Sequence, residues 1–266
     1  MNREAGMKQA AAEDQAWPDR LWLVRHGQSA GNVARDAAHD AGLPLIDIAT
    51  RDADTPLSDV GREQSLALGE WFAALAPSDR PQAIIASPYV RARETARIVG
   101  QALGLPLQAP EFVIDERLRE KEFGILDRYT SRGIREKFPE LAELRSRVGK
   151  FYFRPPGGES WCDVILRLRG MIDTLTRDYR GTRVLVVGHQ VIVSCFRYLL
   201  EHLDEAAVLA IDRAEDVPNC SVTTFRYNPA LGPRGGLELE SANVVAPVAQ
   251  SPAPVTREPD QPRGPR

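Results

Sequence analysis

The chain has 266 residues, 43% hydrophobic and 27% charged, which suits one large domain with a sizeable core. Its 34 basic and 37 acidic residues give a net charge of −3, which argues against a nucleic-acid partner held by bulk charge. No apolar run approaches the roughly 18 residues that cross a membrane, and the first residues lack the apolar stretch of a signal peptide. These features predict a cytoplasmic protein with no membrane or nucleic-acid partner.

The two ends of the chain differ in composition from the rest. Residues 1–19 are polar and rich in alanine without a usable periodicity, and we expect a flexible arm there. Residues 247–266 contain six prolines and few large apolar side chains, which predicts a disordered tail. The single domain is therefore expected to span residues 20–246.

The pattern of apolar segments predicts the fold class. Leu21–Val24, Ala83–Ala86 and Arg183–Val187 are short, almost wholly apolar segments that are each followed by helix signals. Strands of this kind are typical of a parallel sheet covered by helices on both faces. Ser221–Tyr227 alternates and favours an antiparallel or edge strand, and Leu237–Glu240 could add a short edge strand. We predict an α/β fold, a three-layer α/β/α sandwich with a mostly parallel central sheet.

Three helices are predicted from local signals. An apolar stripe at helical spacing runs along Ser58–Leu75. Ser160 to Asp163 has the form of a capping box and should open a second helix. Val191–Leu203 is a mostly apolar helix that directly follows the third strand.

Residues suited to phosphate chemistry follow the three apolar strands. Arg25, His26 and Gly27 come directly after the first, and Gly27 would allow a tight turn. Arg91 lies one turn into the helix after the second, and His189 ends the third. Ligands of α/β sheets bind just beyond the carboxyl ends of parallel strands, where backbone N–H groups can hold an anion. A phosphate site at this edge is the prediction.

These residues belong to a set of motifs that resembles the histidine phosphatase superfamily, whose members include cofactor-dependent phosphoglycerate mutases and fructose-2,6-bisphosphatase. The motifs occur in the family's order over roughly residues 20–228. They are RHGQSAGN (25–32), TPLSDVGREQSLALG (55–69), SPYVRARETA (87–96), RLREKEFG (117–124), PPGGES (155–160) and VLVVGHQ (184–190).

The resemblance implies a role for each matching residue. His26 would be the nucleophile and Glu120 the general acid. Two guanidiniums and a histidine could neutralise the phosphoryl oxygens without a metal, so no metal or cofactor is expected. The residues implied to bind the transferring phosphoryl group or to lie near it are Arg25, Arg91, His189, Ser29 and Asn32.

Other residues resemble a sugar-bisphosphatase branch of the family, within a group of broad phosphatases. Lys150 and Gln190 match residues that hold the sugar phosphate there, as does Arg145 or Arg147, depending on one inserted residue. The chain also departs from that branch, because three of its substrate-holding positions, two Tyr and one Arg, are occupied here by Ser131, Trp161 and Ser194.

The resulting hypothesis is a metal-independent phosphomonoesterase that acts on a small phosphorylated metabolite through a phosphohistidine on His26. A phosphoglycerate mutase is an alternative, although Glu120 is followed by Lys-Glu-Phe-Gly and only 35 residues separate it from Pro156. A phosphoprotein or phosphohistidine phosphatase is a further alternative. A silent binding module is the weakest, since every catalytic residue that the resemblance implies is present.

Overall fold

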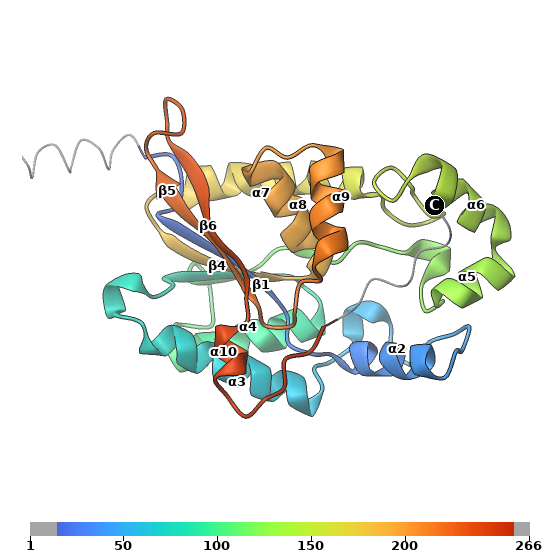
Figure 1. The fold of residues 1–266 in the computed structure, drawn as a ribbon. Coiled ribbons are helices and arrows are strands. Elements are labelled where there is room, and N and C mark those ends of the chain that lie inside the picture. The colour runs from blue at the N-terminus through green and yellow to red at the C-terminus, as the bar shows by residue number, and fades with distance from the viewer. Residues whose placement is uncertain (1–14, 258–266) are drawn as a thin grey trace, which may run out of the picture.

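The computed structural model describes residues 15–257 and is organised around one six-stranded sheet (Figure 1). The strand order is β3-β2-β4-β1-β5-β6. The first four of these strands run parallel, and β5 pairs with β1 and with β6 in the antiparallel sense. The mostly parallel sheet is thereby confirmed, with the antiparallel strands at one edge. The strands are β1 (Arg20–Arg25), β2 (Ala83–Ala86), β3 (Phe112–Ile114), β4 (Arg183–Gly188), β5 (Val222–Asn228) and β6 (Gly236–Val244).

Alternation along the buried strands divides the core into two parts. In β1, Leu21 and Leu23 face a cluster formed with α7 (Trp161–Asp178) and α8 (Gln190–Leu200), and Trp22 and Val24 face a second cluster formed with α3 (Asp59–Ala74) and α4 (Val90–Leu103). Successive side chains of a strand point to opposite faces, so an almost wholly apolar strand needs a cover on both sides. Figure 1 shows α7, α8 and α9 on one side of the sheet and α3, α4 and α10 on the other. The three-layer sandwich is confirmed.

Local signals place the helices as predicted. The side chain of Ser58 accepts a hydrogen bond from the N–H of Gly61 and caps α3. Ser160 and Asp163 form a complete capping box at the start of α7. The helices are α2 (Ala30–Asp40), α3 (Asp59–Ala74), α4 (Val90–Leu103), α5 (Ser131–Lys137), α6 (Pro139–Val148), α7 (Trp161–Asp178), α8 (Gln190–Leu200), α9 (Glu205–Ala214) and α10 (Ala246–Ala249); the short 3₁₀ helices are η1 (Asp52–Asp54), η2 (Pro77–Asp79), η3 (Glu116–Leu118) and η4 (Gly124–Leu126).

Both ends of the described chain differ from the expected arm and tail. At the amino end, Trp17 packs on the α7–α8 cluster, and Asp19 donates its N–H to the carbonyl of Thr182 at 3.0 Å. At the carboxyl end, Val248 of α10 is fully buried against the α3–α4 cluster. Residues 15–19 and 247–257 therefore belong to the domain, because their few apolar side chains find a place in its core. Residues 1–14 and 258–266 lie outside the described part of the chain.

The carboxyl segment is also held by hydrogen bonds to α3. Nε2 of Gln64, a fully buried side chain, donates to the carbonyl of Pro254 and to Oγ1 of Thr256, both at 2.8 Å. A buried amide needs such partners, because leaving its polar atoms unpaired costs free energy. The proline-rich segment thus supplies the hydrogen-bond acceptors for a buried amide of α3.

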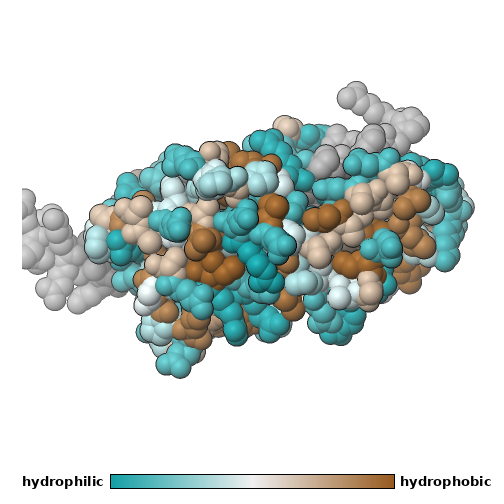
Figure 2. Space-filling view, turned by 90° about the horizontal axis from the view of Figure 1, so that it is seen from below, coloured by the Kyte–Doolittle hydropathy of each residue, from teal (hydrophilic) through white to brown (hydrophobic). Residues whose placement is uncertain are grey.

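On the face that Figure 2 shows, apolar groups are interspersed with polar ones. None of the helices within residues 15–257 is both long and apolar enough to cross a lipid bilayer.

The packing of α10 predicts a stability effect. Val248→Ala should lower the free energy of unfolding by about 2 kcal/mol, because two buried methyl groups are lost and a cavity remains. Pro252→Ala, at an exposed position of the same segment, should change it by less than about 0.5 kcal/mol. Urea denaturation of the full chain measures both. Equal, small effects would show that the segment adds nothing to the core.

Candidate active site

Strand register brings the two predicted histidines together. In the parallel pair of β1 and β4, Arg25 lies opposite Gly188. The next residue of each strand is therefore a histidine, and the N–H of His26 donates to the carbonyl of Gly188 at 3.0 Å. The ring centroids of His26 and His189 are 5.1 Å apart, with the rings inclined by 65°. Both side chains are buried, with 3% and 0% exposure.

Hydrogen bonds fix which nitrogen of His26 is reactive. Nδ1 lies 2.7 Å from the carbonyl oxygen of Gly27, which can only accept, so Nδ1 carries the proton. Nε2 then presents its lone pair, and Nε of Arg91 donates to it at 3.2 Å. The turn requires glycine at 27, since a Cβ there would lie 2.4 Å from the carbonyl oxygen of Gly61. Nε2 is the nitrogen available for nucleophilic attack.

The surroundings of His26 keep its ring neutral. Burial lowers the pKa of His26 well below its ordinary value, and the nearby charges of Arg91 and Arg25 lower it further. A neutral imidazole retains the lone pair that a protonated ring has lost. The same charges that would bind an anion therefore keep the Nε2 lone pair of His26 available.

Two buried guanidiniums supply the positive charge. Nη1 of Arg25 donates to the carbonyl of Val217 at 2.7 Å and to Oε1 of Gln190 at 3.2 Å. Burial lowers the pKa of Arg25 to about 10, which leaves it charged at neutral pH. Arg91 comes from the first turn of α4, after β2, and its Nη atoms contact Asp52.

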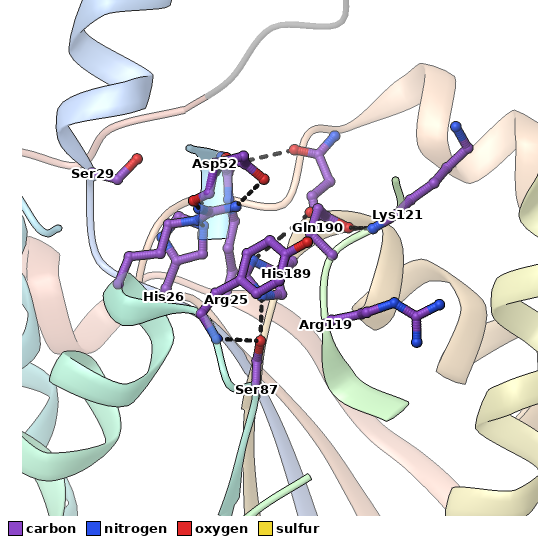
Figure 3. A network of polar contacts seen from close by, with 12 residues as sticks. Arg25, His26, Ser29, Asp52, Ser87, Arg119, Lys121, His189 and Gln190 are labelled. Carbon is purple, nitrogen blue, oxygen red and sulfur yellow. Dashed lines mark hydrogen bonds and ion pairs between the residues drawn. The ribbon is translucent and has the colours of Figure 1, made fainter. Parts of the chain in front are cut away.

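His189 and Glu120 complete the cluster. Nε2 of His189 lies 2.8 Å from Oγ of Ser87, at the end of β2, and Figure 3 shows Ser87 beneath the histidine ring. Within residues 15–257, Nδ1 of His189 is buried without a hydrogen-bond partner, and Oε2 of Glu120 lies 3.9 Å from it. Burial raises the pKa of Glu120, although the N–H of Lys121 donates to its Oε1 at 2.8 Å and partly offsets that rise. A carboxyl group that keeps its proton is suited to act as an acid.

A brace from α7 holds the segment that contains Glu120. The guanidinium of Arg167 donates to the carbonyls of Arg117 and Arg119 and pairs with Glu159 at 3.0 Å. Glu159 in turn bonds Arg119 at 2.6 Å. Charged bonds of this kind fix the backbone that leads to Glu120.

Ser29 and Asn32, predicted near the phosphoryl group, serve first as a helix cap. Oγ of Ser29 accepts from the N–H of Asn32, and Oδ1 of Asn32 accepts from the N–H of Ser29, which is a capping box at the start of α2. In Figure 3 Ser29 lies to one side of the histidines. Their substrate contact stays a prediction.

The predicted substrate residues separate into two groups. Gln190 contacts Arg25 in the centre of the site. Lys150 instead donates to Oδ2 of the buried Asp212 at 2.6 Å. The charges of Arg145 and Lys150 both help to lower the pKa of the buried Lys121, which burial above all brings to about 8. Arg145 and Lys150 therefore both lie within electrostatic range of Lys121, which directly follows Glu120.

Sequence reasoning missed several residues of the site. Ser87 could have been found from its position, since it directly follows β2 just as His26 directly follows β1. Asn219 had no such sequence signal, yet its Nδ2 donates to the carbonyl of His26 at 2.9 Å from a position 193 residues away. Asp52 likewise lies outside all of the motifs quoted above.

Residues 21–232 match the sequence profile of the histidine phosphatase superfamily (branch 1). The chain belongs to this superfamily. The predicted family and fold are confirmed. Among residues 15–257, no cluster of three or more His, Cys, Asp or Glu side chains could hold a metal ion.

Several members of the superfamily are similar over most of the chain. "Probable phosphoglycerate mutase GpmB" of Yersinia enterocolitica is 28% identical over 229 residues, which are 85% of this chain and 94% of that protein. "Phosphoglycerate mutase-like protein AT74H" of Arabidopsis thaliana is 33% identical over 175 residues, 62% of this chain, and the match spans only 56% of that protein.

Solved structures agree on the fold. Mycobacterial glucosyl-3-phosphoglycerate phosphatase, in complex with inorganic phosphate, has a TM-score of 0.64 at 26% identity, covering 86% of this chain and 99% of that one. The alpha-ribazole phosphatase of Shigella flexneri has a TM-score of 0.64 at 22% identity, covering 85% and 97%. The second likeness shows the fold alone.

The electrostatics of His26 can be tested without substrate. Arg91→Gln removes a positive neighbour, so the pKa of His26 should rise toward its ordinary value while burial keeps it below. Arg97→Gln, at an exposed position of the same helix, should leave it unchanged. An NMR titration of the imidazole signals, assigned with His26→Asn, measures both. An unchanged pKa in Arg91→Gln would remove Arg91 from the field at His26.

Proposed function

We propose that the chain is a metal-independent phosphomonoesterase that forms a phosphohistidine on Nε2 of His26. The observation that carries the proposal is the buried, neutral His26, whose Nε2 lone pair lies beside the guanidinium of Arg91. Phosphoryl transfer depends mainly on positioning and on neutralising charge at the phosphoryl oxygens. Arg25 and Arg91 offer such donors around His26, and the ring of His189 lies beside it.

In the first half of the proposed reaction, Nε2 of His26 attacks phosphorus and the bond to the ester oxygen breaks. Glu120 gives its proton to the departing oxygen, so the alcohol leaves neutral. The carbonyl of Gly27 stabilises the positive ring by accepting from Nδ1.

In the second half, Glu120 takes a proton from water as the water oxygen attacks the phosphorus of phospho-His26. The P–N bond breaks, and inorganic phosphate leaves. His26 regains its Nε2 lone pair, and Glu120 is again protonated. The raised pKa of Glu120 supports both directions of this proton transfer.

The substrate we propose is a small phosphorylated metabolite with a second anionic group. The support is Lys121, which directly follows Glu120, together with the charges of Arg145 and Lys150 that act on it. The similar mycobacterial structure is that of a phosphatase whose named substrate, glucosyl-3-phosphoglycerate, is of this class. Gln190, Ser29 and Asn32 stay as proposed substrate contacts.

A phosphoglycerate mutase is the second candidate, because relatives that match most of this chain carry that name. A mutase must return the phosphoryl group to a bound product before water reaches phospho-His26. Release of inorganic phosphate and transfer between positions of phosphoglycerate distinguish the two.

The central experiment is phosphate release from a panel of phosphomonoesters in EDTA. The panel includes fructose 2,6-bisphosphate, 3-phosphoglycerate, glucosyl-3-phosphoglycerate and p-nitrophenyl phosphate. We expect turnover by the wild type and trapped acid-labile phosphohistidine, and neither in His26→Ala, which should fold normally. A His26→Ala variant that still turns over would refute the mechanism.

The role of Glu120 can be tested by the leaving group. Glu120→Gln should slow alkyl phosphates by about 100-fold or more, but slow p-nitrophenyl phosphate, whose leaving group needs no proton, far less. Because the pKa of Glu120 is raised, wild-type turnover of alkyl esters should fall as pH rises through that pKa and the acid loses its proton. This limb should be missing in Glu120→Gln. Equal losses on both substrates would assign the acid elsewhere.

A further inference from the structure

A carboxylate occupies the phosphate-binding face of Arg91. Nη1 of Arg91 lies 3.0 Å from Oδ1 of Asp52, and Nη2 donates to Oδ2 at 3.1 Å. Nη1 also donates to the backbone carbonyl of Asp52 at 2.6 Å. A guanidinium holds carboxylates and phosphates in the same two-point geometry. Asp52 therefore uses the donors that a phosphoryl group would need.

The same guanidinium also covers the nucleophile. Its Nε donates to Nε2 of His26, whose lone pair must attack phosphorus. Arg91 is thus held between Asp52 and His26, and its side chain is only 6% exposed, whereas that of Asp52 is 45% exposed. In Figure 3 Asp52 lies on the side of the cluster opposite Ser87. Asp52 meets the site from the solvent side.

The segment that contains Asp52 is anchored on both sides. The N–H of Ile46 donates to the carbonyl of Arg128 at 2.8 Å, before Asp52. After it, the N–H of Leu57 donates to Oε2 of Glu94 at 2.8 Å. The 3₁₀ helix η1 between these anchors is closed by the N–H of Thr55 donating to the carbonyl of Asp52. The Asp52 side chain can leave Arg91 without unfolding this segment.

We propose that Asp52 is a positioning residue that competes with the phosphoryl group for Arg91 and so sets the affinity for substrate and for released phosphate. This inference rests on the proposed function. The carboxylate holds Arg91 in place, over Nε2 of His26, while the site has no phosphoryl group. An incoming phosphoryl group displaces it, and after hydrolysis its return helps inorganic phosphate to leave.

The sign of the expected effect separates competition from mere support. If Asp52 only held Arg91 in place, its removal would weaken phosphate binding. If it competes, Asp52→Asn, which keeps the shape but loses the charge, should bind inorganic phosphate about tenfold more tightly. Asp52→Ala should do the same.

The chain offers a matched control in the same 3₁₀ helix. Asp54 is also a half-exposed carboxylate, but it pairs with the exposed Arg51 at 2.5 Å. Asp54→Asn removes an equal negative charge two residues further along the chain, at a carboxylate that pairs with Arg51 and not with Arg91. It should leave the affinity for phosphate at the wild-type value.

The experiment is calorimetric titration of the full chain and its variants with inorganic phosphate at constant ionic strength, followed by kcat and KM on a turned-over ester. Tighter phosphate binding and a lower KM in both Asp52 variants, with kcat changed less than the affinity, would support competition. Equal or weaker binding in Asp52→Asn, or the same gain in Asp54→Asn, would overturn it.

The two proposals fail in different ways. If phospho-His26 never forms but wild type and Asp52→Asn bind phosphate with the expected difference, the proposed reaction is wrong and the competition stands. If phospho-His26 forms but the Asp52 variants bind phosphate as the wild type does, the role of Asp52 is wrong and the reaction stands. Absence of phosphate binding in all variants would overturn the competition.

Discussion

The parallel pairing of β1 with β4 is the constraint on which the site depends. Because Arg25 lies opposite Gly188, each strand is followed directly by a histidine at the same level, and the ring centroids of His26 and His189 are 5.1 Å apart. A shift of either strand by one residue would turn its side chains to the opposite face and separate the rings. The apolar side chains that fill both faces of these strands fix this register. The same strand register therefore determines both the packing of the core and the geometry of the site.

Burial at this edge acts on each ionisable group according to its chemistry. Desolvation disfavours every charged form. His26 responds by staying neutral, and Glu120 responds by holding its proton to a higher pH. The pKa of Arg25 falls only to about 10, so that group keeps its charge. One dry environment therefore lowers the pKa of His26, raises the pKa of Glu120 and still leaves Arg25 charged at neutral pH.

The centre of the site could be predicted from sequence because its residues follow the predicted apolar strands. His26, His189 and Arg91 follow three apolar segments, and parallel strands bring such positions to one edge. The outer site could not be predicted, because its contacts depend on side-chain choices between distant elements. Lys150 pairs with Asp212, and Asp52 pairs with Arg91. The spacing of these residues along the sequence predicts neither pair. Composition likewise predicts a disordered tail from residue 247. In the structure, a few apolar side chains of residues 247–257 are enough to pack this segment against the core.

Hydrogen bonds join the packed carboxyl segment to the turn that contains His26. Gln64, which holds the carbonyl of Pro254, accepts from the N–H of Gln28 at 2.8 Å, two residues beyond His26. Thr256 donates to Asn219 at 3.0 Å, and Asn219 donates to the carbonyl of His26. Two relays, each passing through one amide side chain and linked to each other at Thr256, join this segment to both sides of the turn that contains His26. Substitutions in this stretch, which lies beyond the matched residues 21–232, can therefore alter the geometry of the turn that contains His26.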